Sequence, residues 1–282
     1  MSQRAVIGEL STAFPVRLLC RVADLSLSSY YYRPRDDDDL TLLSQIEDVL
    51  VRFPTYGYRR IAIQLQREQH LVNHKRVYRV MRENDLISVA RQRVSTTHSV
   101  HGYERYPNLV KGLEVTRPDQ VWCADITYIQ LRRGVVYLAI VLDLFTRSLR
   151  GWHLGRTLST ELAMAALEQA LSQGLPEIHH SDQGVQYAAE GYAGMLQRLG
   201  IEISMAAVGQ ATENAYAERV IRTIKEEEVY LSDYESFEDA AKHIGHFITD
   251  VYQPKRIHSA LGYLTPAEFE ASYWEHARNT TP

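Results

Sequence analysis

Three acidic residues stand where a metal-binding carboxylate could face outward: Asp125, Asp182 and Glu218. Asp125 interrupts an apolar, strand-like run, and a buried acid is costly unless it is protonated, paired or bound to a cation. Asp182 follows a short strand-like run and precedes a Gln-Gly turn, a place where parallel-sheet proteins display reactive groups. Because Mg²⁺ takes a few carboxylates together with water and phosphate oxygens, these acids predict a divalent-cation site and a polyanionic substrate.

Glu218 lies in a long helical pattern that covers residues 212–230. A buried stripe recurs there at helical spacing: Ala217, Val220, Ile221 and Ile224. A second stripe is charged: Glu218, Arg222 and Lys225. At about 100° per residue the two stripes are roughly 115° apart, so Glu218 can face a site while the apolar stripe anchors the helix.

Six stretches carry a family resemblance, in the expected order along most of the chain: residues 56–61, 73–77, 122–128, 180–187, 213–225 and 256–266. They resemble the DDE transposases and retroviral integrases, and more closely the product of the second reading frame in the insertion-sequence-three family. Two positions depart from the family pattern, Glu213 where Asp is usual and Gln253 where Asn is usual. Neither departure touches the three carboxylates.

The resemblance implies an insertion-sequence DDE transposase that cleaves a DNA 3′ end and transfers that strand to another phosphodiester. It implies that Asp125, Asp182 and Glu218 are catalytic and hold two Mg²⁺ ions per active site, with Mn²⁺ as a substitute. Two alternatives stay open at this point. One is a structure-selective DNA nuclease with the same core, and the other is a DNA-binding regulator derived from a transposase.

The order of the predicted elements indicates an α/β protein. Strand patterns near residues 120–131, 135–145 and 149–154 precede a helix at 160–173, a strand at 177–181, a helix at 188–199 and a strand at 202–205. Three strands followed by alternating helices and strands predict a mixed sheet flanked by helices. The resemblance adds that this sheet is ribonuclease-H-like and is preceded by a small all-α helix-turn-helix region.

We predict four regions from these patterns. Residues 1–52 form an N-terminal helical region, 53–90 a basic helix-turn-helix-like DNA-binding domain, 91–117 a linker or arm, and 118–282 an integrase-type catalytic core with C-terminal helices. The net charge of −4 hides an uneven distribution. Residues 1–115 carry 17 Lys and Arg against 13 Asp and Glu, and the remainder carries 14 against 22. Basic residues are therefore concentrated in the predicted DNA-binding part, and acidic residues in the predicted metal-binding part.

The DNA-binding prediction depends on a helical hairpin. A helix at about 58–69 buries Ile61 and Leu65, and a second helix begins at Asn73 as its N-cap and buries Val77, Val80 and Met81. From spacing alone, its basic face fits a solvated hairpin better than a recognition helix, and the resemblance reverses that preference. The predicted DNA contacts are Arg59, Arg60, Lys75, Arg76, Arg79, Arg82, Arg222, Lys225 and Arg256.

Several polar residues compete for supporting roles. Asp143 also interrupts an apolar strand and by pattern could replace Asp125; the resemblance favours Asp125 and leaves Asp143 as a structural or supporting acid. His180 would face the same side of its strand as Asp182, although a core histidine with a satisfied hydrogen bond is at least as plausible. Asn214 is a third supporting candidate.

Lys225 has two interpretations. The resemblance implies that it contacts the DNA end, whereas on the residues alone it could form a weak surface pair with Glu227 or Glu228.

The N-terminal part and the remaining segments give smaller predictions. Residues 15–32 are predicted to form a short helical pair, which is either a packing element or a small helix-turn-helix. The acids at 36–39 place negative charge at the start of a predicted helix at 40–52, where it is favourable. Residues 209–214 read as a loop that ends in a helix cap at Thr212. Cys20 and Cys123 lack metal-ligand spacing and are expected to be buried, reduced thiols.

The expected partners are the terminal repeats of the element, target DNA and further copies of the chain in an oligomer on DNA. The product of an upstream reading frame, as a fusion or a partner, is a further candidate. No membrane is expected, because the longest apolar run, residues 135–142, is far shorter than the roughly 20 residues of a membrane helix. The sequence thus predicts a cytoplasmic, nucleoid-associated protein.

Overall fold

The structure is a computed structural model that describes residues 3–31, 39–87, 106–206 and 215–280. Contacts group the chain into two units, Met1–Glu47 and Asp48–Pro282. In the first unit, helices α1 (Gln3–Leu10), α2 (Val16–Val22) and α3 (Leu27–Tyr31) bury Ile7 and Cys20. The Ser26 hydroxyl accepts a hydrogen bond from the Ser29 amide (3.0 Å) at the start of α3. The predicted helical pair at 15–32 is therefore present.

The basic helical hairpin has the predicted form. Helix α4 (Asp39–Arg52) precedes α5 (Tyr58–Arg67) and α6 (His74–Glu83). The Asn73 side chain accepts a hydrogen bond from the Lys75 amide (2.8 Å) and so caps α6 as predicted. The predicted apolar faces are buried: Ile61 and Leu65 on α5, and Val77, Val80 and Met81 on α6.

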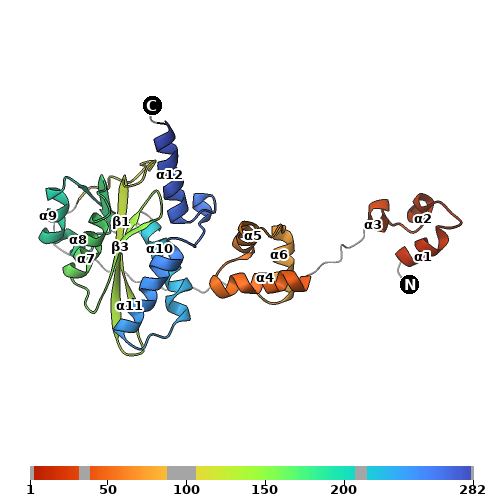
Figure 1. Cartoon of the computed structure of the whole chain (residues 1–282), viewed down its shortest axis with the longest axis horizontal. Helices are drawn as coiled ribbons and strands as arrows, with labels where there is room; N and C mark the ends of the chain where they lie inside the picture. The colour runs from red at the N-terminus through yellow and green to blue at the C-terminus, as the bar shows by residue number, and fades with distance from the viewer. Residues whose placement is uncertain (1–2, 32–38, 88–105, 207–214, 281–282) are drawn as a thin grey trace. The chain divides into compact units, whose positions relative to one another are not determined.

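Five strands form one mixed sheet in the order β3-β2-β1-β4-β5 (Figure 1). They are β1 (Val121–Gln130), β2 (Val135–Asp143), β3 (Leu149–Gly155), β4 (Ile178–Ser181) and β5 (Glu202–Met205). The β1–β2 and β2–β3 pairs are antiparallel, whereas β4 runs parallel to both β1 and β5. The prediction of a mixed α/β sheet flanked by helices is confirmed.

Helices cover both faces of the sheet, which Figure 1 shows nearly edge-on. On one face lie α7 (Thr160–Leu171), α8 (Val185–Ala188) and α9 (Glu190–Arg198), packed with Trp122 and Ala124. On the other lie α10 (Ala215–Glu227), α11 (Phe237–His246) and the π-helical η3 (Phe247–Tyr252), packed with Cys123. Successive residues of β1 thus serve opposite layers, as the two-residue period of a strand requires.

The C-terminal part closes the core. Short 3₁₀ turns η2 (Val229–Leu231) and η4 (Ser259–Leu261) and the helix α12 (Pro266–Thr280) complete the described elements. Helix α7 crosses β3 very closely at Gly151, where an added Cβ would lie 2.0 Å from the carbonyl oxygen of Ala166. Among the helices that the structure describes, none is both long enough and apolar enough to cross a membrane.

Candidate active site

The strand register brings Asp125 and Asp182 to the same level of the sheet. Cys123 on β1 is the parallel partner of His180 on β4. Two residues further along each strand come Asp125 and Asp182, and adjacent strands are only about 4.8 Å apart. Asp182 follows the last residue of β4, so its carboxylate is carried by the turn at the carboxyl end of that strand. The amide of Gly184 donates to Asp182 Oδ1 (2.9 Å) and fixes that turn.

Helix α10 supplies the third acid. Its predicted apolar stripe is buried against β1 and β2: Ala217, Val220, Ile221 and Ile224. Glu218 lies in the first turn of α10 and is half-buried. Because Cys123 packs on the α10 side of the sheet and Asp125 is two residues along β1, Asp125 and Glu218 share that side.

Electrostatics show that the three acids act on one another. The pKa of Asp125 rises from 3.8 to about 8, chiefly because burial disfavours the charged carboxylate, with Asp182 and then Glu218 adding repulsion. A hydrogen bond from the Ile126 amide (2.8 Å) and the charge of Lys225 act in the opposite direction. Without a cation, the Asp125 carboxyl therefore keeps its proton at neutral pH.

The donor set fits divalent cations that keep part of their hydration shell. Crowded carboxylate oxygens are the ligands that Mg²⁺ and Mn²⁺ prefer, and a positive ion would relieve the repulsion felt by Asp125. Within the described ranges, no three His, Cys, Asp or Glu side chains converge closely enough to hold an ion by themselves. An ion held there would therefore need further ligands, such as water or oxygens of the substrate.

One cation lies near Asp125, and a second lies at the start of α10. The Lys225 ammonium sits 4.5 Å from the centre of the Tyr128 ring, and burial lowers its pKa while the charge of Asp125 raises it. The Arg147 guanidinium lies 4.1 Å from the ring centre of Tyr216, two residues before Glu218. The sequence identified Lys225 as a candidate but gave Arg147 no role. Its backbone φ of 61° is uncommon for a residue other than glycine and marks a constrained turn.

The supporting candidates have different surroundings. His180 is buried, and its Nδ1 is 2.8 Å from the Ser204 hydroxyl, so it links β4 to β5 as a core histidine can. Asp143 pairs with Trp122 across the sheet and so faces away from Asp125. Its Oδ1 accepts from the amide of Thr146 (2.7 Å) and its Oδ2 from the amide of Asp119 (2.6 Å). These bonds support a structural role for Asp143. Asn214 and the predicted cap Thr212 lie outside the described residues.

The predicted DNA contacts of the hairpin are largely at the surface. Lys75 and Arg82 are exposed on α6, where Arg76 is half-buried and Arg79 pairs with Glu83 (3.1 Å). On α5, Arg59 is exposed, with its guanidinium 5.3 Å from the Tyr58 ring centre. Arg60 is half-buried, 5.4 Å from the Tyr56 ring centre. Arg222 is half-buried on α10. Contact with DNA stays a prediction for all of them.

The surroundings of Arg256 correct its predicted role. It was predicted to contact DNA, but its side chain is buried and both Nε and Nη2 donate to the Glu227 carboxylate (2.8 and 2.7 Å). Arg60 Nη1 lies 4.0 Å from the same carboxylate. A guanidinium that is buried and already paired has no surface to offer a phosphate, so Arg256 fastens the end of α10 instead.

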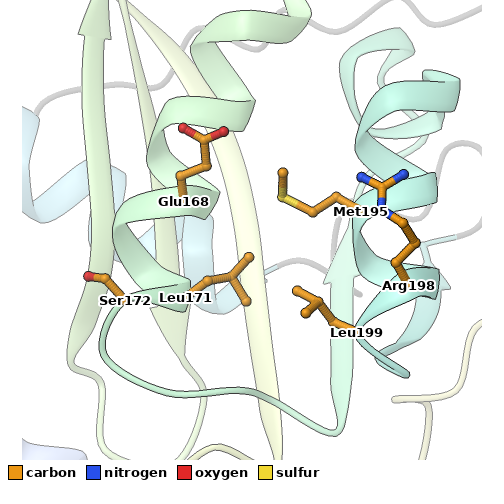
Figure 2. Close-up of a pocket in the computed structure, with 6 residues that line it drawn as sticks. All are labelled: Glu168, Leu171, Ser172, Met195, Arg198 and Leu199. Atoms are coloured by element: carbon orange, nitrogen blue, oxygen red, sulfur yellow. The ribbon is translucent and has the colours of Figure 1, made fainter.

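An open pocket of about 440 Å³ lies between α7 and α9, apart from the acids (Figure 2). Its lining is Glu168, Leu171, Ser172, Met195, Arg198 and Leu199. None of these residues belongs to the predicted site. The two cysteines, Cys20 and Cys123, are buried free thiols, as predicted.

Comparisons with known proteins agree with this arrangement. A family model described as an HTH-like domain matches residues 36–94, and two described as integrase core domains match residues 115–211 and 199–266. The solved catalytic core domain of HTLV-2 integrase aligns with a TM-score of 0.45 and 17% identity, over 54% of this chain and 97% of that one. At that level the likeness adds nothing to the family models. The boundaries of the four predicted regions stay predictions.

Two relatives match nearly end to end. The "Insertion element IS600 uncharacterized 31 kDa protein" of Shigella sonnei is 32% identical over 272 residues, which cover 92% of this chain and 100% of that protein. "Transposase InsF for insertion sequence IS3A" of Escherichia coli (strain K12) is 29% identical over 271 residues, covering 91% and 94%. With its integrase core and HTH-like domain, the chain belongs to the IS3 family of insertion-sequence transposases, which are DDE-type enzymes.

Proposed function

We propose that Asp125, Asp182 and Glu218 are the catalytic carboxylates of DNA 3′-end cleavage and strand transfer. The observation that carries this assignment is that the three acids gather at one buried place: burial, and then repulsion by Asp182 and Glu218, raise the pKa of Asp125 to about 8. Such crowding is unfavourable unless a cation or a shared proton relieves it. The chain tolerates it at the carboxyl end of β4, a place where parallel-sheet proteins carry ligand sites.

The three carboxylates would hold two Mg²⁺ ions, with Mn²⁺ as a substitute. When bound, the ions would supply a lowered pKa for the attacking hydroxyl group and charge stabilisation for the departing oxygen. Asp125 and Asp182 are fixed by adjacent strands, and Glu218 is carried by a helix anchored on the same sheet, so the chain orients the ligands before DNA arrives. Pre-organisation of this kind lowers the cost of assembling the site during the reaction.

The reaction needs two phosphodiester displacements and no covalent protein–DNA intermediate. In the first, water attacks the phosphorus and the DNA 3′ oxygen leaves as a hydroxyl. In the second, that 3′-hydroxyl attacks another phosphodiester, whose own 3′ oxygen leaves. Lys225, whose ammonium lies over the Tyr128 ring and near the charge of Asp125, would contact a phosphate of the DNA end.

DNA recognition belongs to the basic hairpin in this proposal. Arg59, Lys75 and Arg82 are exposed and would meet phosphates or base edges of the terminal repeats. Joining two ends calls for several copies of the chain on DNA, with the product of an upstream reading frame as a fusion or a partner. With a DNA substrate of this kind, the protein would act in the cytoplasm, at the nucleoid.

The test is an assay of cleavage and joining on labelled DNA from the flanks of the gene. The native chain and Asp182→Asn are compared with Mg²⁺, with Mn²⁺ and with EDTA, each with and without the upstream product. Cation-dependent joining that the variant lacks is the expected result. Cation-dependent cleavage without joining would favour the structure-selective nuclease, and binding without cleavage in every condition would favour the regulator.

A further inference from the structure

Tyr187 buries a hydroxyl group on the short helix that follows Asp182. It lies on α8, five residues after Asp182, and only 3% of its surface is exposed. The hydroxyl oxygen is inaccessible and finds no hydrogen-bond partner among the residues that the structure describes. Burying a hydroxyl without a partner is unfavourable, and phenylalanine would fill the same space without that penalty. The hydroxyl therefore calls for an explanation other than packing.

The surroundings of Gly184 show how near the ring is to Asp182. A Cβ added to Gly184 would lie 2.9 Å from Asp182 Oδ1 and 3.4 Å from Cδ2 of the Tyr187 ring. The carboxylate and the ring thus both border the space beside this glycine. The pKa of Tyr187 is raised well above its ordinary value, first by burial, then by Tyr192 and by the charges of Asp125 and Asp182. The hydroxyl stays protonated and can donate to these carboxylates when they are ionised.

Tyr192 provides an internal contrast. Its ring packs edge-on against Tyr187 with centroids 5.4 Å apart, and it is also almost fully buried, at 1% exposed. Its hydroxyl, however, lies 3.0 Å from Nε2 of His179. Burial keeps the pKa of His179 low, at about 3, so this imidazole is neutral and can accept. The Tyr192 hydroxyl is explained by a bond inside the core, and the Tyr187 hydroxyl is not.

We propose that Tyr187 is a positioning residue, whose hydroxyl donates a hydrogen bond to the Asp182 carboxylate when divalent cations bind there. This inference rests on the proposed function, because it takes these acids as the cation ligands. A carboxylate has about four lone-pair sites, so a cation ligand can still accept a hydrogen bond. Donors behind the ligands orient them, and losing one typically costs about 10- to 100-fold in metal affinity or activity.

The experiment compares Tyr187→Phe with the matched control Tyr192→Phe in the full chain. Thermal denaturation in EDTA and in excess MgCl₂ or MnCl₂ reports stability and cation binding without requiring catalysis. Cleavage of labelled end DNA across a Mg²⁺ titration reports the concentration needed for half-maximal rate. We expect Tyr187→Phe to be as stable as the native chain in EDTA, or more stable, and to need about 10-fold or more Mg²⁺. Tyr192→Phe should be less stable and should keep the native Mg²⁺ requirement.

Two results would overturn the inference. One is an unchanged Mg²⁺ requirement in Tyr187→Phe, and the other is a loss of stability in EDTA as large as that of Tyr192→Phe. Failure of the underlying assignment looks different, because the native chain would then cleave without cations or Asp182→Asn would remain active. If Tyr187→Phe has the native Mg²⁺ requirement while Asp182→Asn is inactive, only the role of Tyr187 is rejected.

Discussion

Replacing Asp125 by asparagine should stabilise the cation-free protein and remove its response to divalent cations. The amide keeps the carbonyl oxygen that accepts from the Ile126 amide (2.8 Å), so the local backbone can stay as it is. It removes the ionisable group that Asp182 and Glu218 repel. Most substitutions destabilise a protein, and so the sign alone is informative.

The magnitude follows from the pKa of Asp125. A rise from 3.8 to about 8 corresponds, at about 1.4 kcal/mol for each tenfold change in the equilibrium, to about 6 kcal/mol of unfavourable free energy when the group is ionised. Asp125 is partly open to water, which screens its neighbours, so we expect a gain of about 2 kcal/mol. In a chain of this size, that gain would raise the midpoint of thermal unfolding by roughly 5 °C.

The pH dependence gives the same prediction a second readout. Because the folded-state pKa lies above the unfolded value, the folded protein holds an extra proton between pH 3.8 and about 8. The free energy of unfolding contributed by Asp125 therefore falls as pH rises through that window and levels off above it. In EDTA, the native chain should lose stability from pH 5 to pH 8 more steeply than Asp125→Asn.

The assay is denaturant unfolding at several pH values, in EDTA and in excess MgCl₂, for the native chain and the variant. Magnesium should stabilise the native chain and leave the variant unchanged, because binding to the folded state adds stability only where a site exists. The reasoning would be refuted if Asp125→Asn were less stable than the native chain in EDTA at pH 8, or if both showed the same pH slope.

Three further predictions concern the fold and the DNA-binding surface. Gly151→Ala should destabilise the core by about 3 kcal/mol, measured by urea unfolding, because the added methyl group meets the backbone of α7; native stability would contradict the close crossing. Glu227→Gln should cost about 3–5 kcal/mol in the same experiment, since it leaves the buried Arg256 without a charged partner, and a loss under about 1 kcal/mol would speak against that pair. Lys75→Ala combined with Arg82→Ala should weaken DNA binding and reduce the slope of log affinity against log salt by about 2, measured by fluorescence anisotropy; an unchanged slope would place neither residue on a phosphate.

Much of the site could be predicted from the sequence because its geometry is local. The alternation of apolar residues around Asp125 gives the strand, and the stripe from Ala217 to Ile224 fixes the side of α10 that faces the core. The side of the sheet on which Asp125 lies follows from these two periods. The position of Asp182 next to Asp125 could not be predicted from these periods, because the parallel register of β1 and β4 depends on contacts between distant segments.

Arg256 shows why the remaining features were out of reach. It lies in a matched stretch with other polar residues, and a basic side chain there suggested DNA. Its partner Glu227 is 29 residues away, and only the packed C-terminal elements bring the two together. The unsatisfied hydroxyl of Tyr187 and the stacking of Arg147 on Tyr216 are likewise properties of three-dimensional packing. The spacing of residues in the sequence does not predict them.

The most direct test of the account measures DNA binding and 3′-end cleavage together for Asp125→Asn, Asp182→Asn and Glu218→Gln. Each amide keeps the shape of the acid and removes its charge, so we predict native DNA affinity with cleavage lost in all three. Asp143→Asn is the matched control, a buried acid of the same sheet on the opposite face. Assayed where it remains folded, it should still cleave. Native cleavage by any of the three amide variants, or an equal loss in folded Asp143→Asn, would contradict the assignment of the catalytic carboxylates.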